Sequence, residues 1–340
     1  MAEGRRPTPF PRAVAYFRRH PVLLLLCLTP GIPEYLSGSS SFVLLARNPI
    51  FFLLFLALNV GLYGPGVLLA REAFVRWRPG WAGMILIGAA YGLLEEGTAL
   101  STLFDPATRV VGSQGSYGHF VGVNWVWLVG VLNVHIVFSV GLPILLLGLA
   151  LPETRGRSLL TRRQVGLSLG VYLVDIVLLA LVVGYWRQAS LLLVAAAVVA
   201  VLLYAAARGL PSGALDPTGA SPRLSPKWFF PLGLVFYPVI AVVPGVGSDL
   251  AVWPPVTMAV EVLLLGALFL FVRREVGRQQ NQAALTMLAL GAISPLVVLG
   301  LLFELVVPIV LVADVLFGLF FYALWVRYRP GPLPPPVGAT

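Results

Sequence analysis

Apolar residues are arranged along the chain in ten blocks, separated by short polar segments that are rich in Arg, Pro, Gly and Ser. Each block holds roughly 16–25 residues, the length that an α-helix needs to cross the hydrocarbon core of a bilayer. The pattern predicts an all-α, polytopic transmembrane helix bundle with about ten spans. The predicted spans are residues 21–37, 49–70, 82–103, 125–150, 165–186, 189–207, 229–246, 255–272, 283–303 and 306–326. Proline should interrupt the first span at Pro30 and Pro33, and the seventh at Pro238 and Pro244.

Composition excludes a soluble protein. The 340-residue chain is 59% hydrophobic and 11% charged, whereas soluble domains carry about 25% charged residues. Its net charge of +9 would suit a nucleic-acid-binding protein, but the basic residues lie in short loops and form no continuous patch. We therefore expect the lipid bilayer, and no nucleic acid, as a partner. The single cysteine, Cys27, excludes an intrachain disulfide.

The distribution of basic residues predicts the orientation in the membrane. With ten spans, 20 of the 23 basic residues fall on the side of the N-terminus, and Arg47, Arg109 and Arg187 fall on the other. Because cytoplasmic loops carry the excess of Lys and Arg, both termini should be cytoplasmic, in a bacterial-type plasma membrane. The first apolar block is interpreted as a retained span, since no convincing signal-peptide cleavage site follows it.

Loop composition divides the chain into four parts. Residues 1–208 form a six-span block, 209–228 a flexible cytoplasmic linker rich in Pro, Gly and Ser, 229–328 a four-span block, and 329–340 a disordered tail. A protein partner or a homo-oligomer within the membrane is left open by the sequence.

Ionisable residues inside the predicted spans are the candidates for chemistry, because each costs about 2.5–3.5 kcal/mol to insert. The acidic ones are Glu34, Glu95, Glu96, Asp175, Glu261, Asp314 and, near a span end, Glu304. His135 is the single histidine within a predicted span.

The adjacent pair Glu95 and Glu96 is the most informative feature. On an α-helix these two residues point about 100° apart, so both are not expected to line one cavity equally. Glu95 shares its face with three polar residues, Tyr91, Thr98 and Thr102. Glu96 shares its face with Gly88 and Gly92, where a neighbouring helix can approach closely. Two carboxyl groups this close suit a general base or a shared proton.

Depth in the membrane connects this pair to the next span. Glu96 should lie about 10 Å below the outer end of its span, and His135 roughly 15 Å below the start of the following one. We therefore expect Glu95 or Glu96 to meet His135 in a polar pocket open to the outer side. The candidate catalytic residues are Glu96, Glu95 and His135, and the candidate binding residues are Glu34, Tyr91, Thr98 and Ser139. No metal or other cofactor is assigned.

A glutamate doublet followed by a histidine in a later span resembles the CAAX-protease and bacteriocin-processing family of intramembrane proteases, whose pattern is E-E-x-x-x-R, then F-x-x-x-H. Leu100 and Val131 stand where that family has Arg and Phe. The resemblance implies hydrolysis within the membrane. The stretches Gly31-Ile-Pro-Glu-Tyr-Leu-Ser-Gly and Tyr91-Gly-Leu-Leu-Glu-Glu-Gly are also similar to uncharacterised bacterial multi-pass membrane proteins, which implies no activity.

Three functions remain open from the sequence. In an intramembrane hydrolase, Glu95 or Glu96 would activate water, and His135 would polarise the substrate or help to hold a metal. In a proton-coupled transporter or channel, the acidic residues of several spans would form a relay. In a non-catalytic membrane subunit, a partner would fill the polar cavity. A compact site favours the first, a connected acidic path the second, and an uncovered apolar face the third.

Overall fold

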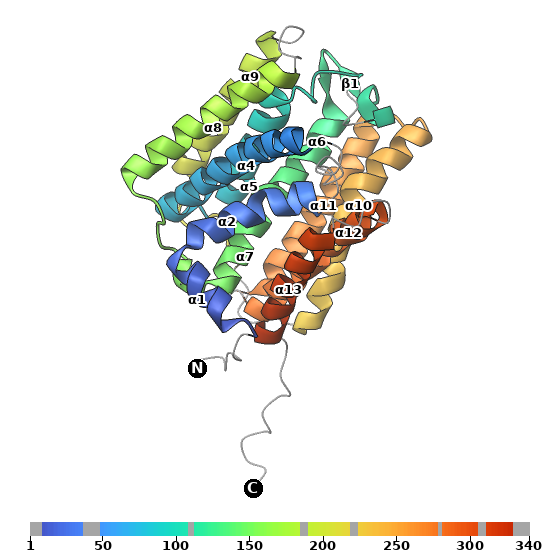
Figure 1. Ribbon diagram of the computed structural model, residues 1–340. Coiled ribbons are helices and arrows are strands. Elements are labelled where there is room, and N and C mark those ends of the chain that lie inside the picture. The colour runs from blue at the N-terminus through green and yellow to red at the C-terminus, as the bar shows by residue number, and fades with distance from the viewer. Residues whose placement is uncertain are drawn as a thin grey trace.

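The computed structural model describes residues 9–36, 48–107, 112–183, 190–217, 224–277, 281–304 and 311–328, and it is an all-α bundle (Figure 1). The main helices are α1 (Pro11–Arg19), α2 (Pro21–Pro30), α4 (Pro49–Trp77), α5 (Gly80–Gly92), α6 (Trp125–Val134), α7 (Leu142–Ala150), α8 (Arg162–Val183), α9 (Ser190–Gly209), α10 (Phe229–Asp249), α11 (Pro254–Val276), α12 (Gln282–Glu304) and α13 (Leu311–Tyr328). Three π-helical segments are η1 (Gly31–Tyr35), η2 (Leu93–Ala99) and η4 (His135–Gly141). Short 3-10 helices are η3 (Gly112–Gly115), η5 (Pro152–Thr154) and η7 (Pro226–Trp228), and one hairpin pairs β1 (His119–Phe120) with β2 (Val123–Asn124).

Every predicted span contains a helix among its described residues. Within the described residues, seven helices are long and apolar enough to cross a membrane. The other three predicted spans correspond to α2 with η1, α5 with η2, and α13. The first of these is short, and the second contains Glu95 and Glu96, which lower its hydropathy. The fold class is confirmed, and the count of ten spans stays a prediction.

Helix α10 corrects one expectation. It continues through Pro238 and Pro244 without the predicted break, because membrane helices tolerate proline where neighbouring groups compensate for the lost hydrogen bonds. Helix α12 packs closely beside it. A Cβ atom on Gly233 would lie 2.1 Å from the carbonyl oxygen of Leu288, and one on Gly291 would lie 2.0 Å from that of Phe230. This backbone contact holds the first turns of α10 against α12.

Segments from distant parts of the chain meet at one end of the bundle. Arg18 of α1 forms an ion pair with Glu153, and Arg327 of α13 donates to the carbonyl of Ala150. The turn at 212–217 packs there too, since the amide of Ala82 donates to the carbonyl of Ala214. The hairpin of β1 and β2 lies at the opposite end (Figure 1). Residues 218–223 of the predicted linker and the tail from 329 lie outside the described residues.

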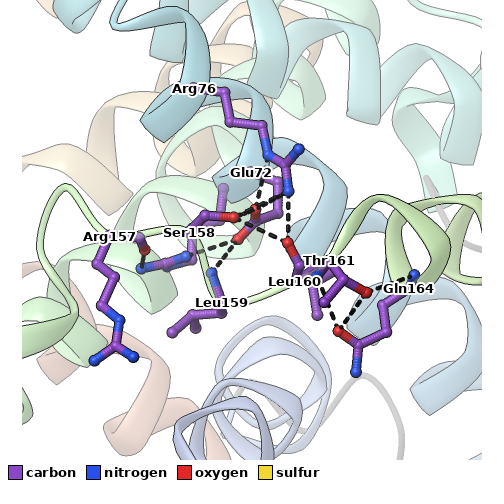
Figure 2. Close-up of polar contacts among 9 residues, drawn as sticks. Glu72, Arg76, Arg157, Ser158, Leu159, Leu160, Thr161 and Gln164 are labelled. Carbon is purple, nitrogen blue, oxygen red and sulfur yellow. Dashed lines mark hydrogen bonds and ion pairs between the residues drawn. The ribbon is translucent and has the colours of Figure 1, made fainter.

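Glu72 is the centre of a polar network at the end of the bundle opposite the hairpin (Figure 2). Its side chain is 2% exposed and pairs with Arg71 at 3.0 Å and with Arg76 at 3.1 Å. It also accepts hydrogen bonds from the hydroxyl of Ser158 and, at 2.8 Å, from the amide of Leu159. The end of α4 is thereby attached to the segment that precedes α8.

The loop charges and this arrangement give a topological prediction. In a protein whose Cys27 is replaced by Ala, a cysteine at Ser212 should react with an impermeant thiol reagent only after the cells are lysed. A cysteine at Phe120, which is 72% exposed in the hairpin at the other end, should react in intact cells. Labelling of Ser212→Cys in intact cells, or of neither site, would contradict the predicted orientation.

Candidate functional site

The three π-helical segments of the described chain carry the candidate site. Segment η1 contains Glu34, η2 contains Glu95 and Glu96, and η4 begins at His135 and contains Ser139. Their wider turns are visible in hydrogen bonds that join residues five apart, such as the amide of Leu100 to the carbonyl of Glu95 at 2.8 Å. Single π-helical turns occur often at functional sites, and here three of them converge.

His135 lies between the two glutamates. Its Nδ1 is 3.5 Å from Oε2 of Glu95, and its Nε2 is 3.2 Å from Oε1 of Glu96. All three residues are buried: Glu95 and His135 are each 2% exposed, and Glu96 is 7% exposed. The predicted meeting of the glutamate pair with His135 is therefore confirmed. We call Glu95, Glu96 and His135 the Glu–His centre.

The expectation that Glu95 and Glu96 would not line one cavity equally did not anticipate that both contact His135. It assumed α-helical directions, whereas the π-helical turn of η2 changes the angle between successive side chains. The imidazole ring also carries a nitrogen on each side, so that one ring contacts both carboxylates. Close packing places the ring there. A Cβ atom on Gly92 would lie 2.9 Å from Cδ2 of His135.

A hydroxyl group contacts each member of the Glu–His centre. Tyr63 of α4 donates to Oε1 of Glu95 at 2.5 Å. Thr102 donates to Oε2 of Glu96, and the indole Nε1 of Trp127 donates to the Thr102 hydroxyl at 3.1 Å. Ser139 lies 2.9 Å from Nδ1 of His135. Thr102 was expected beside Glu95 and lies on Glu96 instead, while Tyr63 and Trp127 were not predicted.

The hydroxyl of Tyr63 contacts two carboxyl groups. Its hydroxyl oxygen lies 2.6 Å from Oε1 of Glu34 and 2.5 Å from Oε1 of Glu95. A phenol has one hydrogen to donate. For both contacts to be hydrogen bonds, one of the two carboxyl groups must carry a proton and donate it to the phenolic oxygen. Glu34 of the first span is thereby connected to the Glu–His centre, as expected from its depth.

The remaining candidates lie at or outside the edge of the centre. The Tyr91 ring packs on the His135 ring, with 5.6 Å between centroids. Thr98 donates to the carbonyl of Leu193 in α9, so it is not brought into the centre. Asp175 packs against Gly61 of α4 and Glu261 against Gly130 of α6. The side chain of Glu304 lies outside the described residues.

An apolar cavity of about 540 Å³ lies between α5, η4, α10 and α11. Ile136 and Val137, the neighbours of His135 in η4, contribute to its lining. Glu95, Glu96 and His135 do not. The predicted polar pocket is not this cavity, and its opening to the outer side stays a prediction.

The contacts of the Glu–His centre predict energetic coupling between its two helices. In a double-mutant cycle, His135→Ala and Glu96→Gln should show an interaction of at least about 0.5 kcal/mol in the free energy of unfolding. The reason is that His135→Ala removes the contact between Nε2 and Oε1, while Glu96→Gln removes the charge of the carboxylate in that contact. Unfolding of the four proteins in detergent measures the coupling, and strict additivity would contradict the contact.

Comparison with known proteins gives a family. The sequence profile of the uncharacterized membrane protein family matches residues 23–326. This match supports a multi-pass membrane protein, and it does not support the resemblance to the CAAX-protease and bacteriocin-processing family. No curated protein and no solved structure matches the chain.

Proposed function

We propose that this chain, which belongs to the uncharacterized membrane protein family, is an intramembrane hydrolase whose Glu–His centre activates water to cleave a peptide bond of a membrane-embedded polypeptide. The observation that carries the proposal is the position of His135 between the carboxylates of Glu95 and Glu96. A carboxylate and an imidazole in contact, with water largely excluded, are the groups that general acid–base catalysis uses.

The proposed roles follow from the contacts. Glu96 accepts a proton from a water molecule, and the resulting hydroxide attacks the carbonyl carbon of the substrate. The protonated Glu96 then gives its proton to the leaving amine as the carbon–nitrogen bond breaks. His135 holds Oε1 of Glu96, and Glu95 faces its other nitrogen as an orienting partner. Ser139 holds His135 in position.

Compactness favours this proposal over a proton relay. A relay needs polar groups connected from one side of the membrane to the other. Within the described part of the chain, neither carboxylate oxygen of Glu261 has a hydrogen-bond partner, and nor does Oδ2 of Asp175. Neither residue forms a hydrogen bond to the Glu–His centre there. The contact of the Tyr63 hydroxyl with both Glu34 and Glu95 is the observation that supports a proton-coupled transporter as the second candidate.

The experiment compares cells that produce the wild-type chain, Glu96→Gln or Thr98→Val. Newly formed N-termini of membrane proteins are quantified by mass spectrometry. Cleavage products should accumulate with the wild type and with Thr98→Val, whose side chain contacts α9, and should be absent with Glu96→Gln. Identical products in all three strains would contradict a hydrolase. Proton uptake into liposomes that depends on Glu95 would then favour the transporter.

A further inference from the structure

We propose that the Glu–His centre binds one divalent transition-metal cation, of which Zn²⁺ is the probe, through Glu95, Glu96 and His135. The role of the cation, which would be to hold the water molecule that the centre activates, rests on the proposed function. The binding itself is argued from the arrangement of the three side chains.

The positions of the donor atoms suit a small cation. One donor atom from each of Glu95, Glu96 and His135 lies within 4.8 Å of the other two. Zinc ligands lie about 2.0–2.2 Å from the metal, which places tetrahedral donors about 3.3–3.6 Å apart. The 3.2 Å between Nε2 of His135 and Oε1 of Glu96 is close to that separation. Three protein ligands leave the fourth position for water, as in catalytic zinc sites.

Hydroxyl groups of three neighbouring side chains orient the three residues. Tyr63 donates a hydrogen bond to Oε1 of Glu95. The other oxygen, Oε2, accepts no hydrogen bond within the described residues and is available to bind a cation. Thr102 holds Oε2 of Glu96, so that Oε1 is directed at His135. Such partners on the non-coordinating atoms fix ligand orientation in metal sites.

Ser139 is the third of these hydroxyl groups, and it determines which nitrogen of His135 is free to bind the cation. Its hydroxyl contacts Nδ1 of His135 at 2.9 Å. When Nδ1 carries the hydrogen and donates it to Ser139, Nε2 is left with its lone pair. Metal-bound histidines in proteins usually donate their other ring N–H to an oxygen in this way.

Charge is the third argument. The carboxylates of Glu95 and Glu96 are buried together, and His135 is their ion-pair partner within the described residues, where no Lys or Arg pairs with them. Unbalanced negative charge in a membrane interior is costly, so protons or a cation must balance it. Carboxylate and imidazole ligands without sulfur favour Zn²⁺, Mn²⁺ or Fe²⁺ over Cu⁺.

The test is the zinc content of the purified full-length protein in detergent. The protein is stripped with a chelator, incubated with Zn²⁺, separated by gel filtration and measured by mass spectrometry. We expect about one Zn²⁺ per wild-type chain, and loss of that zinc in Glu96→Gln. Ser139→Ala and Thr102→Val keep all three ligands, and each should weaken binding about 10- to 100-fold. Two variants are matched controls that should bind like the wild type: Glu261→Gln, at a buried carboxylate, and His119→Ala, at a half-buried histidine of the hairpin.

The outcomes separate the two proposals. Zinc binding that is equal in the wild type, Glu96→Gln, Ser139→Ala and Thr102→Val would overturn the metal site, as would no binding at all. If Glu96→Gln fails to fold, the two hydroxyl variants still decide the question. Peptide cleavage by chelated, zinc-free protein would leave the hydrolase and overturn the role of the cation in holding the water molecule. One zinc per chain without any cleavage product would leave the cation and overturn the hydrolase.

Discussion

Glu96→Gln should fold normally and lose at least about 100-fold in the rate of substrate cleavage, which is the contribution expected of a general acid–base group. Glutamine preserves the shape of the side chain and can keep its contacts with Thr102 and His135. It removes the ability to take and release a proton. Glu95→Gln should retain partial activity, because the proposal gives Glu95 an orienting role. The measurement is the yield of cleavage products at equal amounts of folded protein.

A purely structural pair would produce a different ranking of the variants. If Glu95 and Glu96 only fix the packing of η2 against η4, glutamine should be tolerated at both positions. Alanine or leucine should then lower the stability, because the hydrogen bonds of Tyr63, Thr102 and His135 would lose their acceptors. Equal cleavage by the wild type and both glutamine variants would remove the acid–base role.

Glu72→Ala should lower the free energy of unfolding by about 3–5 kcal/mol, the usual cost of removing one partner of a buried ion pair. Arg71 is 2% exposed and would keep its bonds to the carbonyls of Thr154 and Arg157. It would lose its carboxylate partner, and the amide of Leu159 would lose its acceptor.

 The matched control is Glu153→Ala, since Glu153 pairs with Arg18 at the exposed surface, where the two side chains are 40% and 58% exposed. That change should cost at most about 1 kcal/mol.

Chemical or thermal unfolding of the purified variants in detergent gives this comparison. Glu72→Gln is a useful intermediate, because it can still accept from Ser158 and Leu159 but no longer neutralises Arg71 and Arg76. Equal stability of Glu72→Ala and Glu153→Ala would mean that the network in Figure 2 does not hold α4 to the segment before α8.

The helices could be predicted from the sequence because the bilayer imposes a simple requirement on length and hydrophobicity. Each apolar block corresponds to helix in the structure. The predicted break at Pro238 and Pro244 was wrong because it considered α10 alone. The close contact of Gly233 and Gly291 with the facing backbone depends on the partner helix, which the local pattern does not report.

The candidate site could be predicted only in part. Glu95, Glu96 and His135 were identified as candidates because ionisable residues are costly to place in a membrane. Their similar depths in consecutive spans predicted that they would meet. The π-helical turns were not predicted, because the pattern of apolar and polar residues reports burial and not hydrogen-bond register. Tyr63 was missed although a hydroxyl in the middle of a span requires a partner, a signal that could have identified it.

The most direct test of the central claim uses purified protein reconstituted in liposomes with one synthetic membrane peptide that contains a cleavage site found in cells. Wild type and Glu96→Gln are compared at equal amounts of folded protein. The account predicts that the wild type cleaves the peptide at that bond and that Glu96→Gln is at least about 100-fold slower. Cleavage rates within twofold of each other, or no cleavage by the wild type, would contradict the claim that the Glu–His centre is a hydrolytic site.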